Sequence, residues 1–254
     1  MAERGSCLLE KIDGFIIKEQ DYGETNKIVT IFSKKLGKFN CLARGAKKPR
    51  SRMAAVTQPF VFSRFFVYVN SGLSTIRQGE VLDSFRPVRE DIFKTAYASF
   101  IAELTDKLLD AKQPDGFLFT QYYETMEWIA ENKDGRIPVM MYEMKLYRKA
   151  GIAPIVNHCL HCGSKERPFF FSVANGGLLC GQCKHMDQDA VFLPDNLSKL
   201  LYIFSEVSLE QVGSISVKEQ NIKLLRKILD AYYDQYGGFY LKSRRFLKQM
   251  EKLE

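Results

Sequence analysis

The run Phe60-Val-Phe-Ser-Arg-Phe-Phe-Val-Tyr-Val69 decides the fold of the first third of this chain. Aromatic and β-branched residues fill it, and such residues favour a strand. Four shorter runs of similar composition surround it, at residues 14–18, 27–32, 38–43 and 73–85. Gly37 and Gly72 lie in turns between neighbouring runs, where a glycine suits a hairpin. Five short strands with irregular connections predict a small closed barrel, either an oligonucleotide-binding (OB) barrel or an SH3-like one.

Beyond Pro87 the apolar residues recur every three or four positions, which predicts helices instead of strands. Gly151 and Gly237-Gly238 are expected to end two of these helices, and Ser216-Val-Lys-Glu219 is interpreted as a capping box that begins one. The predicted class is therefore α+β, with a five-stranded OB-fold barrel over residues 8–85 and an all-helical C-terminal domain over 86–254. No apolar stretch approaches the ~18 to 20 residues of a membrane helix. The predicted helices cover residues 88–112, 117–131, 139–150, 197–207, 216–237 and 241–253.

Two cysteine pairs interrupt the helical domain, Cys159-Leu-His-Cys162 and Cys180-Gly-Gln-Cys183. Each CxxC turn directs two sulfurs at one centre, and two such turns complete a tetrahedron around Zn²⁺. The intervening segment, from Phe169-Phe-Phe171 to Gly176-Gly177, predicts a hairpin that brings the pairs together. A redox dithiol is the alternative for a lone CxxC. We predict one structural Zn²⁺ in a module at about residues 155–190, and its ligands are Cys159, Cys162, Cys180 and Cys183.

All three histidines of the chain lie beside these cysteines. His161 lies inside the first pair, so a site of three cysteines and one histidine stays open as an alternative. His158 and His185 are expected beside the metal or in solvent. The sequence lacks the phosphate loop GxxxxGK[ST], the motif GxGxxG after a strand, and the GxSxG and HExxH motifs. Because these signatures are missing and every histidine lies in the cysteine region, we expect a protein that is not an enzyme. Four thiolates leave the metal no open position, which predicts a structural role for it.

The charge is concentrated near the N-terminus. The formal net charge is +7, and the window from Thr25 to Gly79 contains 11 lysines and arginines and no aspartate or glutamate. A field of one sign attracts polyanions, and nucleic acid is the commonest of them. A solvated basic face without a partner is the alternative. Cys41 falls in a strand pattern of this window and is interpreted as a buried thiol.

Five of these cations lie in nine residues, Arg44-Gly-Ala-Lys-Lys-Pro-Arg-Ser-Arg52. Glycine and proline make this segment a loop. Its cations would neutralise backbone phosphates without reading the base sequence. Aromatic residues alternate with the cations, and one or two of Phe39, Phe62, Phe65, Phe66 and Tyr68 would stack on bases. The predicted nucleic-acid contacts are Lys34, Lys35, Lys38, Arg44, Lys47, Lys48, Arg50, Arg52, Arg64 and Arg77.

Three motifs resemble the RecO family of bacterial recombination mediators. They are Asp21-Tyr-Gly-Glu-Thr-Asn-Lys-Ile-Val-Thr30, Ala43-Arg-Gly-Ala-Lys-Lys48 and Tyr240-Leu-Lys-Ser-Arg-Arg-Phe246. The two CxxC pairs fit the zinc-bearing members of that family. The resemblance extends from about Leu9 to Lys252.

The resemblance implies an N-terminal OB barrel and a helical domain with a zinc site. It implies a mediator of the RecF pathway that binds single- and double-stranded DNA, anneals complementary strands and helps to load recombinase onto coated single strands. The implied partners are RecR and single-stranded-DNA-binding protein, with RecF as a further one, and no membrane. Lys242, Arg244 and Arg245 would extend the DNA surface or receive the acidic tail of single-stranded-DNA-binding protein.

Since Met1 to Leu9 lacks the features of a signal peptide, we expect a cytoplasmic, nucleoid-associated protein. Two other functions are alternatives for a protein with this basic N-terminal charge. One is an RNA-binding barrel, and the other is a sequence-specific regulatory zinc protein, although the basic excess lies on strands and loops rather than on a recognition helix.

Overall fold

The computed structural model describes residues 8–131, 134–212 and 216–251, which belong to two compact units. The first unit contains residues 8–131 and 241–251. The second contains residues 134–240 except the three at 213–215. The predicted division into domains at residues 85 and 86 stays a prediction. Among the described residues, no helix is both long and apolar enough to cross a lipid bilayer.

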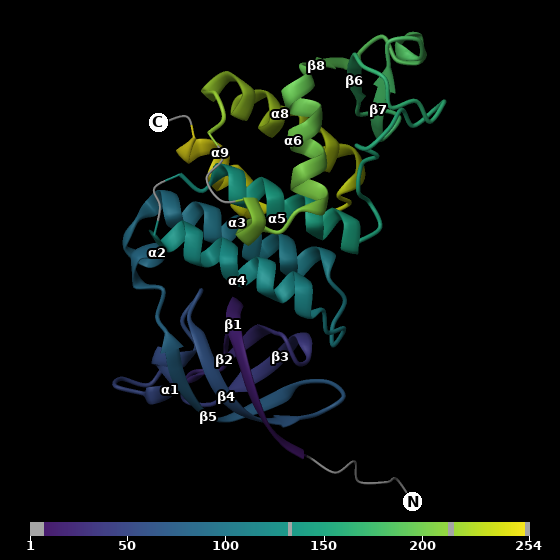
Figure 1. Ribbon diagram of the computed structural model, residues 1–254. Coiled ribbons are helices and arrows are strands. Elements are labelled where there is room, and N and C mark those ends of the chain that lie inside the picture. The colour runs from purple at the N-terminus through teal and green to yellow at the C-terminus, as the bar shows by residue number, and fades with distance from the viewer. Residues whose placement is uncertain (1–7, 132–133, 213–215, 252–254) are drawn as a thin grey trace, which may run out of the picture. The chain divides into compact units, whose positions relative to one another are not determined.

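The first unit contains a closed five-stranded barrel, as predicted (Figure 1). The strand order around it is β1-β2-β3-β5-β4. β3 and β5 pair in parallel and the other neighbours are antiparallel. This arrangement, with a helix between β3 and β4, is that of an OB barrel and not of the SH3-like alternative. The elements are β1 (Leu8–Tyr22), β2 (Asn26–Ser33), β3 (Gly37–Ala43), α1 (Arg52–Val56), β4 (Phe62–Val69) and β5 (Ser74–Asp83).

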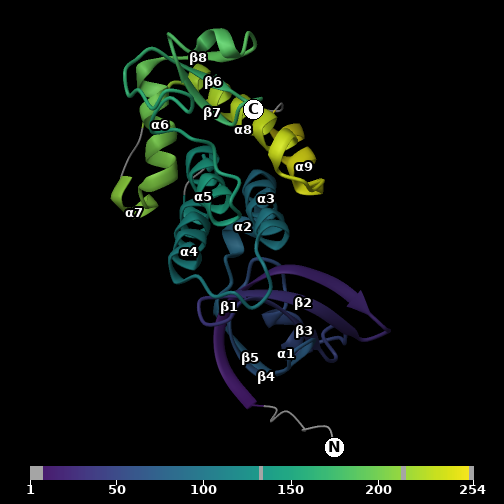
Figure 2. The same cartoon turned by 90° about the vertical axis from the view of Figure 1, so that its right-hand side faces the viewer.

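The barrel core follows from the alternation of side chains along each strand. On β4, Phe65 and Val67 are buried in the core, while Phe66 and Tyr68 point outward and are half-buried. Cys41 is fully buried in the same core, as expected. Figure 2 shows β1 as a long curved strand beside β2. Near its middle, a Cβ atom on Gly14 would lie 2.7 Å from the carbonyl oxygen of Phe32, so only glycine fits there.

Helices cover one side of the barrel. Phe15 and Phe62 of the barrel pack against Tyr123 of α4, with ring centroids 5.6 and 5.2 Å from that of the tyrosine. The predicted helix over 88–112 is divided in two at Asp91, whose carboxylate accepts the N–H of Phe93 at 2.8 Å and so caps a new helix. The helices of this unit are α2 (Arg86–Glu90), α3 (Ile92–Leu108), α4 (Gly116–Glu131) and α9 (Lys242–Met250).

Helix α9 joins the first unit although more than a hundred residues of chain separate it from α3. The carboxylate of Glu103 on α3 accepts the backbone N–H of Ser243 at 2.8 Å and that of Lys242 at 3.3 Å. These are N–H groups at the start of α9, which have no partner inside the helix. Leu241, the residue before α9, has no side-chain oxygen to accept these hydrogen bonds. Glu103, from a distant segment, therefore caps the helix in its place.

The second unit combines helices with a small three-stranded sheet of order β7-β6-β8. The predicted hairpin is present as β6 and β7, and β8 adds a strand that the sequence did not indicate. Gly151 has φ +74° just after α5, and Gly237-Gly238 ends α8, both as expected. The elements are α5 (Arg136–Lys149), β6 (Phe169–Ser172), β7 (Gly177–Cys180), η1 (Lys184–Met186), β8 (Val191–Leu193), α6 (Asp195–Glu206), α7 (Leu209–Val212) and α8 (Glu219–Tyr236).

The predicted capping box at Ser216–Glu219 is wrong. Helix α8 begins at Glu219, so Lys218 occupies the capping position and makes no side-chain capping bond. Glu219 is therefore the first residue of the helix instead of the third, where a capping box needs it. Its carboxylate instead accepts hydrogen bonds from Arg136 of α5 at 2.8 and 2.9 Å.

Candidate nucleic-acid interface and metal centre

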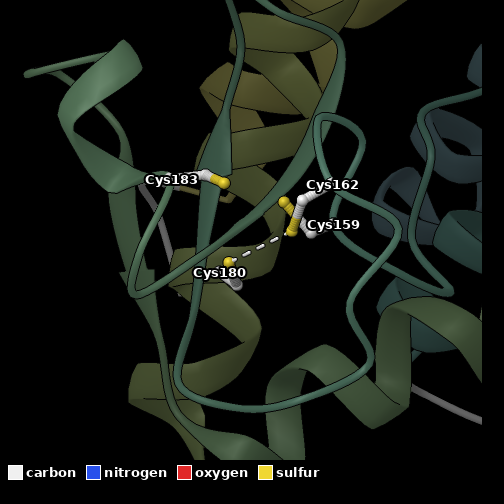
Figure 3. A group of neighbouring side chains, drawn as sticks. All are labelled: Cys159, Cys162, Cys180 and Cys183. Atoms are coloured by element: carbon white, nitrogen blue, oxygen red, sulfur yellow. Dashed lines mark hydrogen bonds between the residues drawn. The ribbon is translucent and has the colours of Figure 1, made fainter.

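The four cysteines of the two CxxC pairs form one cluster, as predicted. Their sulfur atoms all lie within 4.8 Å of one another, and those of Cys162 and Cys180 are 3.7 Å apart. Figure 3 shows the side chains directed toward a common space. Sulfurs bound to one zinc ion with Zn–S bonds of about 2.3 Å are about 3.8 Å apart in a tetrahedron, so the cluster fits such an ion.

A backbone hydrogen bond closes the turn of each CxxC pair. The N–H of Gly163 donates to the carbonyl of Cys159 at 2.9 Å, and the N–H of Cys183 donates to that of Cys180 at 3.0 Å. The hairpin holds the two turns together, because the N–H of Leu160 donates to the carbonyl of Leu178 on β7 at 2.8 Å.

The thiols of the cluster differ in acidity. Burial alone would raise the pKa of the Cys159 thiol. Hydrogen bonds to its sulfur from the backbone N–H groups of Cys162, Cys180 and His161 outweigh that effect and lower the pKa to about 6. Burial and the neighbouring sulfurs raise the pKa of Cys183 to about 12. Cys159 is therefore ionised more readily than Cys183.

No histidine belongs to this cluster in the described part of the chain, which includes all three of them. His161 is exposed to solvent. The Nδ1 atom of His185 lies 2.8 Å from the carbonyl oxygen of Gln182. The cluster that could hold a metal ion thus consists of the four cysteines and does not include His161.

The basic loop Arg44–Arg52 is fixed to the barrel by the turn between β1 and β2. The side-chain oxygen of Asn26 accepts the N–H of Gly45 at 2.9 Å, and the carbonyl of Thr25 accepts the N–H of Lys47 at 2.9 Å. Gly45 has φ +68°, a conformation in which glycine carries no steric penalty. Asn26 belongs to the motif Asp21–Thr30, and no local pattern in the sequence indicates that it supports this loop.

Most cations of the loop are available to a ligand. Lys47 donates to the carboxylate of Asp21 at 2.7 Å, and that hydrogen bond lowers the pKa of Asp21. The other four are exposed, and no described residue forms an ion pair with them: Arg44, Lys48, Arg50 and Arg52. Arg77 lies beside this group, because Ile76 pairs with Ala43 in the parallel ladder and Arg77 is the next residue on β5.

Four predicted contacts lie outside this group. Lys34 and Lys35 lie in the turn before β3, at the opposite end of that seven-residue strand from the loop. That distance is roughly 20 Å at about 3.3 Å per residue. Lys35 pairs with Glu10, while Lys34 is exposed.

The remaining two, Lys38 and Arg64, have acidic partners. Burial lowers the pKa of Lys38, whose Nζ donates to the carbonyl of Asp106 and lies 3.7 Å from its carboxylate. Arg64 makes two hydrogen bonds of 2.9 Å to Asp13, which raise its pKa. Their role in binding stays a prediction.

The five candidate aromatic residues divide by face. Phe39 and Phe65 fill the barrel core, and Phe62 packs on α4. Phe66 and Tyr68 are half-buried on the outer face of β4 and are the two rings available to a base. On α9, Lys242 and Arg245 are exposed, while Arg244 is buried.

Comparison with known proteins identifies the family. The family model described as Recombination protein O N terminal matches residues 8–85, and Recombination protein O C terminal matches residues 89–245. A protein of Oceanobacillus iheyensis named DNA repair protein RecO is 62% identical over 244 residues, which cover 96% of this chain and 95% of that protein. Proteins of the same name from Bacillus cereus and Bacillus anthracis are 42% identical over 247 residues, 97% of this chain and 100% of theirs. On its barrel, its cysteine cluster and these matches over nearly its whole length, the chain belongs to the RecO family.

Proposed function

We propose that this chain is a mediator of DNA repair and recombination in the RecF pathway. It binds single- and double-stranded DNA without sequence preference and anneals complementary strands. The observation that carries the proposal is the set of four exposed cations on the basic loop, Arg44, Lys48, Arg50 and Arg52, with which no described residue forms an ion pair. A barrel of OB topology holds this loop in a fixed position. The family membership supports a role in repair, because the relatives are named DNA repair proteins.

Binding by this loop follows from counterion release. Lysine and arginine side chains that contact phosphates release condensed cations from the nucleic acid, and they read no base. The described residues of the loop contribute no carboxylate that would oppose a phosphate. Phe66 and Tyr68 on the outer face of β4 offer rings for the bases of a single strand.

Annealing needs two polyanions to approach each other. A cationic surface lowers their mutual repulsion and keeps the bases free to pair, and it needs no nucleotide hydrolysis. The proposed activity is accordingly that of a binding protein without a reaction of its own. RecR, single-stranded-DNA-binding protein and RecF are proposed partners, and the recombinase is loaded onto the coated strand with RecR.

The cysteine cluster is proposed to hold one structural zinc ion. Cys159, Cys162, Cys180 and Cys183 would supply four thiolates, and the ion would join the loop before β6 to the end of β7. A closed thiolate shell leaves the ion a role in stability. The protein is proposed to act in the cytoplasm, on the nucleoid.

The test replaces the five cations of the basic loop, Arg44, Lys47, Lys48, Arg50 and Arg52, by glutamine. Binding of a labelled single strand is measured by fluorescence anisotropy over a range of salt concentrations. If all five contact phosphates, the slope of log K against log salt falls by about 3 to 4, at about 0.7 per contact for single strands. The control removes the same charge from the second unit, at Arg148, Lys149, Lys184, Lys223 and Lys227.

Unchanged affinity and slope in the loop variant would refute this assignment. Unrelated DNA and RNA of equal length serve as competitors. Preference for one DNA sequence would favour a regulator, and preference for RNA would favour an RNA-binding barrel.

A further inference from the structure

A cationic groove follows helix α6 in the second unit, apart from the basic loop. One cavity of about 470 Å³ lies between the cysteine module and α6, with Lys165, Arg167, Lys199 and Tyr202 in its lining. A second cavity of about 520 Å³ shares Lys199 and Ile203 with the first and reaches Lys218 before α8. We call these two adjoining cavities the α6 groove; Figure 2 shows α6 and the neighbouring sheet β6–β8.

The charge of the α6 groove has one sign. Its lining contains Lys165, Arg167, Lys199 and Lys218, and among the described residues no aspartate or glutamate lines either cavity. Arg167 lies 3.8 Å from the carboxylate of Asp195, a long and partly exposed pair that is worth little. No residue in the described parts of the chain forms an ion pair with the three lysines. The sequence did not reveal this feature, because residues 91–254 as a whole hold equal numbers of acids and bases.

An exposed aromatic ring lies among these cations. Tyr202 is 46% exposed and lines the first cavity. It follows Lys199 by three residues on α6, and residues at that spacing lie on the same face of a helix. An exposed ring beside cations is the arrangement with which proteins bind single strands, since a base stacks on the ring while phosphates contact the cations.

The distribution of charge favours an extended ligand. Three of the four cations, Lys165, Arg167 and Lys199, line the first cavity, and Lys218 lines only the second. The cationic lining therefore extends beyond one cavity, which is more than a single small anion needs. A strand of nucleic acid carries a regular series of phosphates and bases, and this matches a groove that is lined by both cations and an exposed ring. A peptide rich in acidic residues also carries negative charge, but it has no regular ring to stack.

We propose that the α6 groove binds a second single strand of nucleic acid. This inference rests on the proposed annealing function and adds to it. One chain then carries two strand sites, the basic loop on the first unit and the α6 groove on the second, so that each of two complementary strands has its own cationic support.

The test counts the strands bound per chain. A labelled oligo-dT is titrated at concentrations far above its dissociation constant, and the break point gives the stoichiometry. The full-length protein should bind two strands per chain. A groove variant with Lys165, Arg167 and Lys199 replaced by glutamine should bind one, and so should the loop variant. Their combination should bind none, with zinc content and melting temperature showing that each variant is folded.

Two controls isolate the groove from general charge and shape. Replacement of Arg148, Lys223 and Lys227 by glutamine removes equal charge from the same unit and should leave two strands bound. Tyr202→Leu should weaken the second site about tenfold through lost stacking, while Tyr202→Phe keeps the ring and should bind like the natural protein.

Either of two results would overturn the proposal. One is a groove variant that still binds two strands. The other is a groove variant that binds DNA as the natural protein does but no longer binds a synthetic peptide of aspartate and phenylalanine, which would make the groove a peptide site. Failure of the proposed function looks different, because the loop variant would then bind DNA normally.

Discussion

Asn26 should control the DNA affinity of this protein although it carries no charge. Its side-chain oxygen accepts the N–H of Gly45 at 2.9 Å and so fixes the start of the basic loop. Asn26→Ala removes this bond and leaves the one between Lys47 N–H and Thr25 carbonyl, which uses only backbone atoms. The half-buried N–H of Gly45 then lacks its acceptor, which costs about 1 to 2 kcal/mol.

If the loop of the variant is no longer held in place, DNA must order it on binding, and the free energy of binding is weaker by about the same amount. A loss of about 1 to 2 kcal/mol corresponds to a dissociation constant about 5- to 30-fold higher. The slope of affinity against salt should not change, because every cation is still present. Fluorescence anisotropy with a labelled single strand gives both quantities, and amide hydrogen exchange at Gly45 reports the loosened loop.

The control is Asn175→Ala, which makes the same chemical change in the turn between β6 and β7 of the other unit. It should leave affinity unchanged. The reasoning is refuted if Asn26→Ala speeds exchange at Gly45 and yet binds DNA as tightly as the natural protein. A lower salt slope would also refute it, because contacts would then have been lost.

Three further predictions concern stability. Cys159→Ser should abolish zinc binding and the cooperative melting of the second unit, measured by metal analysis and calorimetry, because such sites contribute folding energy directly. Arg226→Met should lower the free energy of unfolding, measured in urea, by about 3 to 5 kcal/mol, because it removes the cation 2.6 Å from the fully buried carboxylate of Glu143 and leaves that charge, among the described residues, only the hydrogen bond from Tyr147. Adding Glu143→Leu should restore most of that loss. Burial raises the pKa of Asp134, but hydrogen bonds from Arg136 lower it overall below its ordinary 3.8. The contact between Asp134 and Arg136 therefore stabilises the folded protein fully above pH 3.8, and this contribution is lost as the pH falls through the lower folded-state pKa of Asp134. Arg136→Ala should remove this part of the acid unfolding curve.

Each of these three has a contradicting result. A metal-free Cys159→Ser protein with natural melting would show that the cluster is not needed for the fold. A small effect of Arg226→Met would show that water reaches Glu143. An unchanged acid curve for Arg136→Ala would show that Asp134 keeps its ordinary acidity in the folded protein.

The fold was predictable where local pattern decides it. Alternation along Phe60–Val69 and the glycines of the turns were enough for the barrel, because a strand with one buried face must alternate. β1 extends over Leu8–Tyr22, well beyond the predicted run, because its outer residues are charged and hide the pattern. α1 has only five residues, too few to show a helical period. The return of α9 to Glu103 was beyond prediction, since periodicity does not identify the partner of a helix.

The candidate site residues were likewise predictable only where local sequence determines their arrangement. Spacing alone predicted the four cysteines, because each CxxC turn is a local structure. Counting charges could not separate free cations from paired ones. Arg64 and Asp13 are 51 residues apart, and Lys38 and Asp106 are 68 apart, so only the folded chain shows that they meet. Asn26 was missed for the same reason.

The measurement that tests the central claim most directly is the annealing of two complementary strands, each coated with single-stranded-DNA-binding protein, with and without this chain. The account predicts acceleration that needs no ATP, declines with salt and is lost when the five cations of the basic loop are replaced by glutamine. Equal acceleration by the natural protein and by that variant, at every salt concentration, would contradict it.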